Sequence, residues 1–336
     1  MSDANGPEKI NRRSAIVRTG AGALGFGLVG AVGVETVATR NANQPHANQP
    51  HANQPHANQP HASFRQPMEG RRMAMSLKYG MIGPGATVME KFEIAKAAGF
   101  DGVELDSPGP VAIDDAKRAM DATGLVVPGV VDSAHWSKPF SSADPNVRGE
   151  GRRALETAIS DCAALGGSTV LVVPAVVNGS VSYADAYERS INEISMLVPM
   201  AEELGVAIGF ENVWNSFLLS PLEAARYVDA FDSAHVGWYF DVGNIVAFGW
   251  PTHWIEALGQ RVLKLDVKEY SRQKRDREGM WAGFGVEIGE GDCQWPEVNK
   301  ALHAIGYRGW ASAEVGGGDA ARLTNIRSRM RSVLGE

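Results

Sequence analysis

The chain has little cysteine and no surplus of positive charge. Cys162 and Cys293 are its two cysteines in 336 residues, which argues against a disulfide scaffold and against a cysteine-rich zinc site. Lys and Arg number 32 against 39 Asp and Glu. Residues 1–75 hold eight of the basic and four of the acidic residues, so residues 76–336 carry a net charge of about −11. Such an acidic body lacks the basic face that a nucleic-acid backbone requires, and we expect no nucleic-acid partner.

A long apolar run is also missing. Residues 21–34 are apolar and glycine-rich, but a membrane helix needs about 20 apolar residues, so we expect no stable membrane insertion. This run follows the pair Arg12-Arg13 and precedes the small residues of Thr36-Val37-Ala38. Basic, apolar and small-residue zones in that order indicate an export signal, and the paired arginines resemble the twin-arginine type. We therefore predict a signal at 1–38 and a periplasmic or other extracytoplasmic location; the alternative is a basic disordered tail.

Residues 39–75 have the composition of a disordered linker. Residues 42–61 are four copies of Ala-Asn-Gln-Pro-His, and a proline in every fifth position prevents a long helix. The four histidines of the repeat are able to collect metal weakly, but a repeat expansion without chemistry is the favoured interpretation. Met73 and Met75 follow the linker, and a chain that starts at either of them would remain cytoplasmic.

Residues 76–336 match the length of a (β/α)8 TIM barrel, which is roughly 250 residues. The run 168–173 is continuously apolar, as expected for a strand that is covered on both faces. A helix–glycine–aromatic–glycine–strand–acid pattern occurs at 98–104 and again at 305–314, which is a weak internal repeat. We predict strands at 77–82, 103–105, 126–131, 168–173, 206–211, 236–241, 262–266 and 310–314. Eight helices alternate with them, one of them at 183–204, and 270–293 is expected to be a charged lid loop.

Four carboxylates are expected at the carboxyl ends of strands five to eight, where the strands of a barrel converge on one mouth. They are Glu211, Asp241, Asp266 and Glu314. Clustered carboxylates repel one another unless they are protonated or bound to a cation, so we predict one divalent metal ion. Oxygen ligands favour Mn²⁺ or Mg²⁺ over Zn²⁺, with Co²⁺ as a further candidate. The alternative is that each acid merely caps a neighbouring helix.

Several motifs together resemble the sugar isomerase/epimerase superfamily of xylose isomerase-like barrels. They lie at 210–215 (Phe-Glu-Asn-Val-Trp-Asn), 239–244 (Tyr-Phe-Asp-Val-Gly-Asn), 264–272, 289–292 (Gly-Glu-Gly-Asp) and 313–314. The ketose 3-epimerases and the L-xylulose- or L-ribulose-phosphate 3-epimerase-like proteins are the nearest branches. The resemblance covers 76–336 and implies a divalent-metal-dependent isomerase with a small sugar substrate. It implies proton abstraction alpha to a ketose carbonyl through a metal-bound enediolate, with Glu211 and Glu314 as the acid/base pair.

The sequence departs from this family at several positions. The strand-seven ligand is usually histidine, in His-x-Lys-Asp, whereas this chain has Asp266 followed by Lys268 and Glu269. Asn244 stands where the epimerases often have a substrate-binding histidine, and Phe217 stands where some carry a second acid. These differences leave the substrate open. The remaining candidates for substrate binding are Arg272, which matches a family arginine, with Lys268, Asn244, His135, Trp136 and Glu104.

Two other functions stay open. A non-catalytic sugar-binding or lyase-like relative of the same barrel would also explain the changes at Asp266 and Asn244. A DNA-repair endonuclease would need three zinc ions and several histidines, but His135 alone follows a predicted strand end. If the protein is exported, an unphosphorylated or oxidised sugar, or a polyol ketone, is a better substrate than a sugar phosphate. A homo-oligomer is compatible with the sequence.

The export signal has a direct test. We expect Arg12→Lys/Arg13→Lys, made in the full chain, to abolish export in a host with a twin-arginine pathway, because that pathway requires the arginine pair. Fractionation of the host followed by immunoblotting measures the exported share, and Arg18→Lys is the control. Export that survives in the double variant would contradict the prediction.

Overall fold

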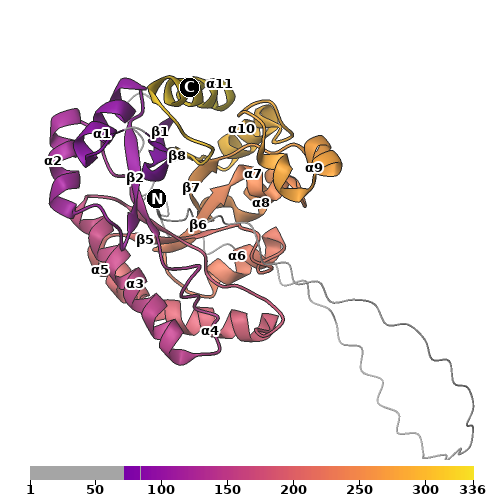
Figure 1. Ribbon diagram of the computed structural model, residues 1–336. Helices are drawn as coiled ribbons and strands as arrows, with labels where there is room; N and C mark the ends of the chain where they lie inside the picture. Colours follow the sequence, from indigo (N-terminus) through magenta and orange to yellow (C-terminus); the bar gives the residue numbers. More distant parts are fainter. Residues whose placement is uncertain (1–71, 84) are drawn as a thin grey trace, which may run out of the picture. The chain divides into compact units, whose positions relative to one another are not determined.

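The computed structural model describes residues 72–83 and 85–336, and the predicted signal and repeats lie outside the described residues. Eight parallel strands form one closed barrel in sequence order, and β8 returns to pair with β1. The helices form a ring around the strands (Figure 1). The TIM barrel prediction is confirmed. In the part of the chain that is described, no helix combines the length and the apolar character needed to cross a bilayer.

The strands and helices alternate along the chain as predicted. The strands are β1 (Met73–Lys78), β2 (Gly102–Ser107), β3 (Gly129–Asp132), β4 (Thr169–Val172), β5 (Ala207–Glu211), β6 (Val236–Asp241), β7 (Val262–Val267) and β8 (Gly309–Ala313). The helices are α1 (Val88–Ala97), α2 (Ile113–Thr123), α3 (Pro145–Ala164), α4 (Tyr183–Ser195), α5 (Val198–Leu204), α6 (Pro221–Asp229), α7 (Val242–Val246), α8 (Pro251–Leu258), α9 (Arg272–Glu278), α10 (Trp295–Ala304) and α11 (Ala320–Leu334).

Local sequence explains where several helices begin. Thr87 and Glu90 form a capping box at the start of α1, in which each side chain accepts the backbone N–H of the other residue. Ser220 caps α6 by accepting the N–H of Glu223, with Pro221 in the first helical turn. The apolar core lies between the strands and these helices, and it includes a cluster of rings from Phe210, Tyr227 and Phe231.

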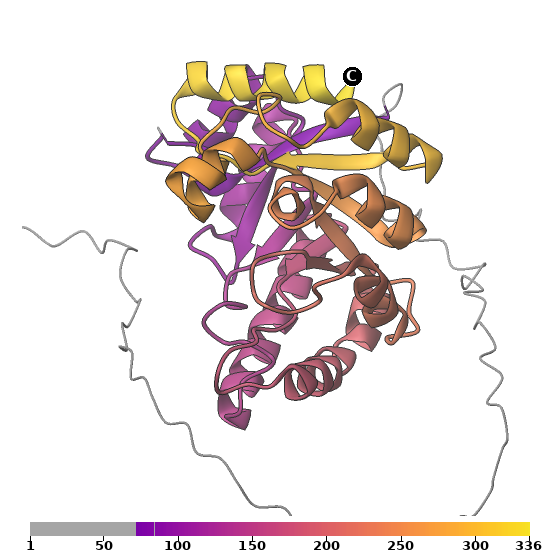
Figure 2. The ribbon, with the colours of Figure 1, turned by 90° about the vertical axis from the view of Figure 1, so that its right-hand side faces the viewer.

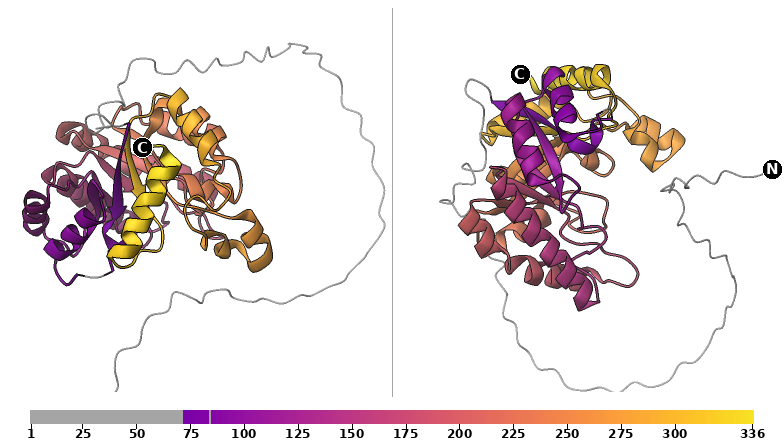
Figure 3. Two further views of the ribbon diagram at one scale, coloured as in Figure 1. Left: turned by 90° about the horizontal axis from the view of Figure 1, so that it is seen from above. Right: turned by 60° about the vertical axis from the view of Figure 1, so that its left-hand side comes forward.

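Segments far apart in the sequence close the ring of helices. The last helix, α11, contacts α1, which is the first. Figure 2 shows α11 in yellow, running across the top of the barrel. In Figure 3, α9 stands out from the ring. The ring is therefore continuous around the strands, while α9 belongs to a segment that projects from it.

The first strand begins earlier than predicted. β1 starts at Met73, and the sequence placed its start at 77 and the linker up to 75. The backbone N–H of Met75 donates to Asp101 Oδ2 at 2.9 Å, and Met73 pairs with Gly309 of β8. Both methionines are fully buried. The barrel therefore includes residues 73–75, and a chain that started at Met75 would lack the first part of β1.

Two other segments differ from the prediction. The helix expected at 183–204 is divided into α4 and α5, because Pro199 in the first turn of α5 has no N–H to continue the hydrogen bonds of α4. The loop expected at 270–293 contains α9 and a 3₁₀ helix, Met280–Phe284. Ser271 starts α9 by accepting the N–H of Lys274 at 3.2 Å. This segment is consequently more ordered than its charged, glycine-rich composition indicated.

Candidate active site at the mouth of the barrel

The barrel gathers the four predicted carboxylates at its mouth. Glu211 ends β5, Asp241 ends β6, Asp266 lies in β7 directly opposite Asp241, and Glu314 follows β8. Each offers one oxygen that lies within 4.8 Å of the oxygens offered by the others. Glu211, Asp241 and Asp266 are buried, and Glu314 is half-buried. Parallel strands of similar length end at one level, which is why acids that follow one another at intervals of 25 to 48 residues meet here.

Two lysines lie between these carboxylates. Lys268 Nζ is 2.8 Å from Asp241 Oδ2 and 3.3 Å from Glu314 Oε2. Lys78 Nζ, at the end of β1, is 2.9 Å from Asp266 Oδ1 and 2.7 Å from Glu104 Oε2. Each ammonium group therefore joins two acids that would otherwise repel each other.

A polar floor supports the site from inside the barrel. Glu104 Oε1 accepts the Tyr239 hydroxyl at 2.6 Å and lies 3.8 Å from Lys264 Nζ, which also donates to the Pro128 carbonyl. Burial lowers the pKa of Lys264 to about 8. A Cβ on Gly129 would lie only 2.6 Å from Lys264 Nζ, so glycine leaves the space that the ammonium group occupies.

The charges at the mouth and floor do not balance. Four clustered carboxylates and Glu104 face Lys78, Lys264 and Lys268, which leaves a formal charge of −2. Among the described residues, no donor hydrogen-bonds Asp266 Oδ2, although it is buried. Buried charges without partners are costly, and a divalent cation would supply both the missing charge and the missing partner. The donor set consists of carboxylate oxygens alone and fits a hard cation such as Mg²⁺ or Mn²⁺.

The two glutamates experience opposite electrostatic effects. Burial raises the pKa of Glu211 well above its usual value, and the nearby Glu314 raises it further. Burial also acts on Glu314, but the ammonium groups of Lys268 and Lys78 outweigh it and hold the pKa of Glu314 below its usual value. The surroundings of the two carboxyl groups therefore shift their pKa values in opposite directions.

Asparagines orient the carboxylates. Asn244 Nδ2 donates to Glu211 Oε1 at 3.3 Å and to the Asn212 carbonyl at 2.9 Å, while its backbone N–H donates to Asp241 Oδ1 at 2.8 Å. Asn212 Nδ2 donates to the Asp241 carbonyl at 2.6 Å. A Cβ on Gly243 would lie 2.9 Å from the backbone of Lys268, so glycine lets α7 pack closely against the end of β7. Asn244, predicted to bind substrate, therefore also positions two acids.

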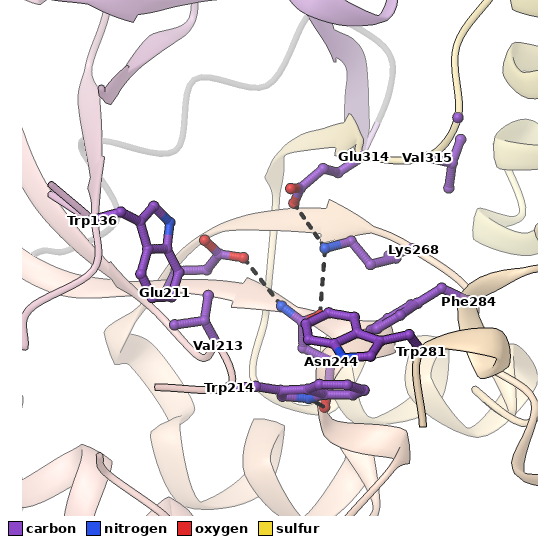
Figure 4. A pocket seen from close by; sticks show the side chains of 11 residues that line it. Trp136, Glu211, Val213, Trp214, Asn244, Lys268, Trp281, Phe284, Glu314 and Val315 are labelled. Carbon is purple, nitrogen blue, oxygen red and sulfur yellow. Dashed lines mark hydrogen bonds and ion pairs between the residues drawn. The ribbon is translucent and has the colours of Figure 1, made fainter. Parts of the chain in front are cut away.

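A cavity of about 490 Å³ opens above the carboxylates. Its lining consists of Trp136, Glu211, Val213, Trp214, Asn244, Lys268, Trp281, Phe284, Glu314, Val315 and Gly316. In Figure 4 the carboxyl groups of Glu211 and Glu314 point into this cavity. The same view places Trp136 on the side opposite Trp281 and Phe284. A polar base and aromatic walls suit a sugar, whose ring has hydroxyl edges and apolar faces.

Three predicted substrate-binding residues do not line this cavity. Arg272 donates to the carbonyls of Val246 at 3.1 Å and Gly249 at 2.8 Å, so the structure uses its guanidinium to hold the loop after α7. Glu104 belongs to the floor. His135 is buried and its Nδ1 accepts the N–H of Val173 at 3.3 Å; burial lowers its pKa to about 4.

Sequence reasoning missed Lys78 and the aromatic wall. Lys78 ends β1, but the sequence placed the end of this strand at residue 82, so the rule that located the four acids did not point to Lys78. Trp214, Trp281 and Phe284 had no comparable signal. The Trp214 ring lies 4.7 Å from that of Trp281 and 5.0 Å from that of Phe284, centroid to centroid. These contacts depend on how the segment 270–293 folds back over β5.

Glu269 anchors that segment. Its Oε2 accepts the N–H of Gly289 at 2.7 Å and the indole N–H of Trp295 at 2.8 Å, and its Oε1 accepts the N–H of Cys293 at 3.2 Å. Glu269 is buried and directly follows Lys268. The Glu269 carboxylate thus joins the end of the segment 270–293 to the residue that directly follows Lys268.

Comparison with known proteins places this geometry in a family. Residues 92–333 match the sequence model described as the xylose isomerase-like TIM barrel. The chain belongs to this family. Its acidic cluster stands at the end of the barrel where enzymes of this architecture carry their chemistry.

The similar proteins include sugar epimerases. SgbU of Escherichia coli (strain K12), provisionally named an L-ribulose-5-phosphate 3-epimerase, is 26% identical over 66% of this chain and 80% of its own length. A D-psicose 3-epimerase, solved in the presence of D-fructose, has a TM-score of 0.65 and 20% identity, covering 79% of this chain and 100% of that one. A structure described as the IOLI protein with a binding zinc atom has a TM-score of 0.63 and 16% identity, covering 78% and 98%. The similar proteins thus include sugar epimerases, and the solved structures share the barrel fold with this chain.

Asp132 provides a test of the electrostatics next to the site. It ends β3 and is fully buried, and its Oδ1 accepts the N–H of Ala134 at 3.0 Å. Burial raises its pKa to about 7, against a usual value near 4. Because the folded state holds this proton more tightly than the unfolded state, Asp132 reduces the stability of the fold as pH rises from about 4 to about 7.

We expect Asp132→Asn to remove this dependence. Between pH 4 and pH 8, the difference in unfolding free energy between variant and wild type should move in favour of the variant by about 1–3 kcal/mol. Urea denaturation at both pH values measures it, and the exposed Asp121→Asn is the matched control. A difference that is the same at both pH values would show that Asp132 ionises normally in the folded protein.

Proposed function

We propose that the protein is a divalent-metal-dependent sugar epimerase or isomerase that moves a proton on the carbon next to a ketose carbonyl. The observation that carries this proposal is the pair Glu211 and Glu314, whose carboxyl groups point into one cavity from the ends of two different strands. Such a reaction needs one group that accepts a proton and one that donates a proton, on either side of the same carbon. The similar sugar epimerases support the same reaction class.

Glu211, Asp241, Asp266 and Glu314 would hold the metal ion. Their oxygen donors favour Mn²⁺ or Mg²⁺, with Co²⁺ as a third candidate, and the zinc described for one similar structure shows that a barrel of this fold accommodates a divalent ion. When bound, the ion supplies Lewis-acid stabilisation of the negative charge that develops on the carbonyl oxygen. The side chains of the protein itself carry out the proton transfers.

The protein side chains divide the proton transfer between them. One of the two glutamates removes the proton next to the carbonyl, and the other returns a proton. Return from the opposite face to the same carbon gives an epimer, whereas return to the adjacent carbon gives an aldose. Asn244 holds the Glu211 carboxyl group in place, and the aromatic walls reduce the access of water to the reacting carbon.

The substrate that this cavity suits is unphosphorylated. Of the residues that line the cavity, Lys268 alone carries a positive charge, and it is engaged with Asp241 and Glu314. A phosphate group would need further donors, such as arginine. Arg272, the arginine nominated from the sequence, is occupied by two backbone carbonyls instead.

A second candidate function is a sugar-binding protein without catalysis. The observation in its favour is the ammonium group of Lys268, which already compensates Asp241 and Glu314 without a metal ion. The two functions differ in their need for metal, because a binder has no use for a Lewis acid at the carboxylates.

Metal binding should stabilise the protein. After dialysis against a chelator, Mn²⁺ or Mg²⁺ at about 100 times its dissociation constant should raise the unfolding free energy by about 2.7 kcal/mol. We expect Asp266→Asn to lower the affinity for the ion at least about tenfold, because the substitution removes a charged ligand. Urea denaturation measures the stabilisation and calorimetric titration measures the affinity for the ion, with the exposed Glu203→Gln as control. Wild-type protein that binds neither ion would favour the non-catalytic alternative.

Proton transfer should depend on both glutamates. In D₂O, the metal-loaded protein is expected to exchange deuterium into one member of a panel of ketopentoses and ketohexoses with and without a terminal phosphate. Glu211→Gln and Glu314→Gln should each lower the exchange rate by about 10²-fold or more, because an amide neither accepts nor returns the proton. NMR follows the exchange, circular dichroism verifies the fold, and Glu203→Gln is again the control. Undiminished exchange in either variant would remove that glutamate from the mechanism.

A further inference from the structure

A second cavity adjoins the first. It has a volume of about 410 Å³ and shares Val213, Trp214 and Asn244 with the cavity above the carboxylates. The rest of its wall is mainly apolar and consists of Asn212, Ser216, Phe217, Leu218, Leu219, Ile245, Phe248, Gly249 and Trp254. None of these residues carries a charge, so a polar chamber and an apolar chamber lie side by side at the mouth of the barrel.

Trp214 is the partition between the two chambers. Its indole N–H donates to the Asn244 carbonyl at 2.9 Å, which fixes the ring beside the site. Trp281 and Phe284 contact the ring from the polar chamber, and Phe248, at a centroid distance of 5.5 Å, contacts it from the apolar chamber. Figure 4 shows Trp214 next to Trp281 at the edge of the polar chamber. The two chambers therefore share Trp214 as a wall, and a ligand long enough to extend past this ring would reach both.

Hydrogen bonds hold part of the wall of the apolar chamber in a strained backbone conformation. Ser216 and Leu218 have backbone φ angles of +59° and +52°, a conformation that side-chain-bearing residues adopt at an energetic cost. The conformation is held because the N–H of Leu218 donates to the Tyr183 hydroxyl at 2.9 Å, and the N–H of Phe217 donates to Asn215 Oδ1 at 3.2 Å. Asn215 is itself fixed by its bond to the Ala175 carbonyl at 2.8 Å. Such strain is characteristic of sites that contact ligands.

The chamber leaves large apolar side chains accessible. Leu219 is 71% exposed and Phe248 is 68% exposed. A sugar that places its reacting carbon between Glu211 and Glu314 fills the polar chamber, and its hydroxyl groups have no partner among the apolar side chains beyond Trp214. An apolar group attached to that sugar would cover Leu219 and Phe248.

We propose that the second cavity binds the apolar aglycone of a glycoside, so that the substrate is a sugar joined to a ring or chain without charge. This inference rests on the proposed function for the placement of the sugar, and it goes further by naming the class of substrate. A glycoside cannot open at its anomeric carbon. Its reactive carbonyl is therefore a ketone on the sugar ring, and glycosides without that ketone bind without reacting.

The test compares two such glycosides as probes. Phenyl β-D-glucopyranoside should bind the metal-loaded protein about tenfold or more tightly than methyl β-D-glucopyranoside, because the phenyl ring buries its apolar surface in the second cavity. Leu219→Ala and Phe248→Ala should each remove about three- to tenfold of this preference and leave the affinity for the methyl glycoside unchanged. Titration calorimetry measures binding of each probe.

Leu222→Ala is the matched control. Leu222 is three residues from Leu219 and is 57% exposed, but it lines neither cavity. Three results would overturn the proposal: equal affinities for the two probes, absence of binding by both, or a loss of the phenyl preference in Leu222→Ala as large as that in Leu219→Ala. The proposal would also fail if Leu219→Ala dissociated an oligomer in sedimentation and left the affinity for both probes unchanged. The chamber would then be an interface between copies of the chain. Deuterium exchange is a separate readout, so failure of catalysis is distinguished from failure of aglycone binding.

Discussion

Uncompensated negative charge in a confined, buried volume is the constraint that organises this protein. Five carboxylates face three lysines at the mouth and floor of the barrel. In water these charges would be screened, but inside the barrel each one needs a partner within a few ångströms. The lysines at the ends of β1 and β7, the asparagines that hold Glu211 and Asp241, and the glycines that leave room for lysine all follow from this requirement. A cation with two positive charges completes the same set.

The arrangement separates two kinds of recognition. Charge and hydrogen bonds select what happens at the reacting carbon, because Glu211 and Glu314 differ in the environment that each experiences. Shape and apolar surface select what is attached to that carbon skeleton, since Trp214 and its neighbours present ring faces and no charge. Barrels of this type vary their loops while the strand ends stay in place, and here the loops that follow β5 and β7 provide nearly all of the apolar surface.

The strand ends were predictable from the sequence, and the loops were not. Glu211, Asp241, Asp266 and Glu314 could be placed together because the alternation of strands and helices determines where each strand ends. Lys78 also ends a strand, but the predicted strand ran from 77 to 82 and placed this lysine near its start. The helix division at Pro199, the ordered segment after Tyr270 and the role of Arg272 depend on contacts between residues distant in sequence. The Arg272 guanidinium binds carbonyls at Val246 and Gly249, which no local pattern indicates. The early start of β1 likewise reflects pairing with β8 at the opposite end of the chain.

Glu269 has a mechanical consequence. It receives hydrogen bonds from Gly289, Cys293 and Trp295, and a single peptide bond separates it from the lysine that touches Asp241 and Glu314. A displacement of the segment that carries Trp281 and Phe284 would therefore pull on Glu269 and, through it, on the neighbouring Lys268. The position of the segment 289–295 and the charge balance at the acids are therefore linked through two consecutive residues, Lys268 and Glu269.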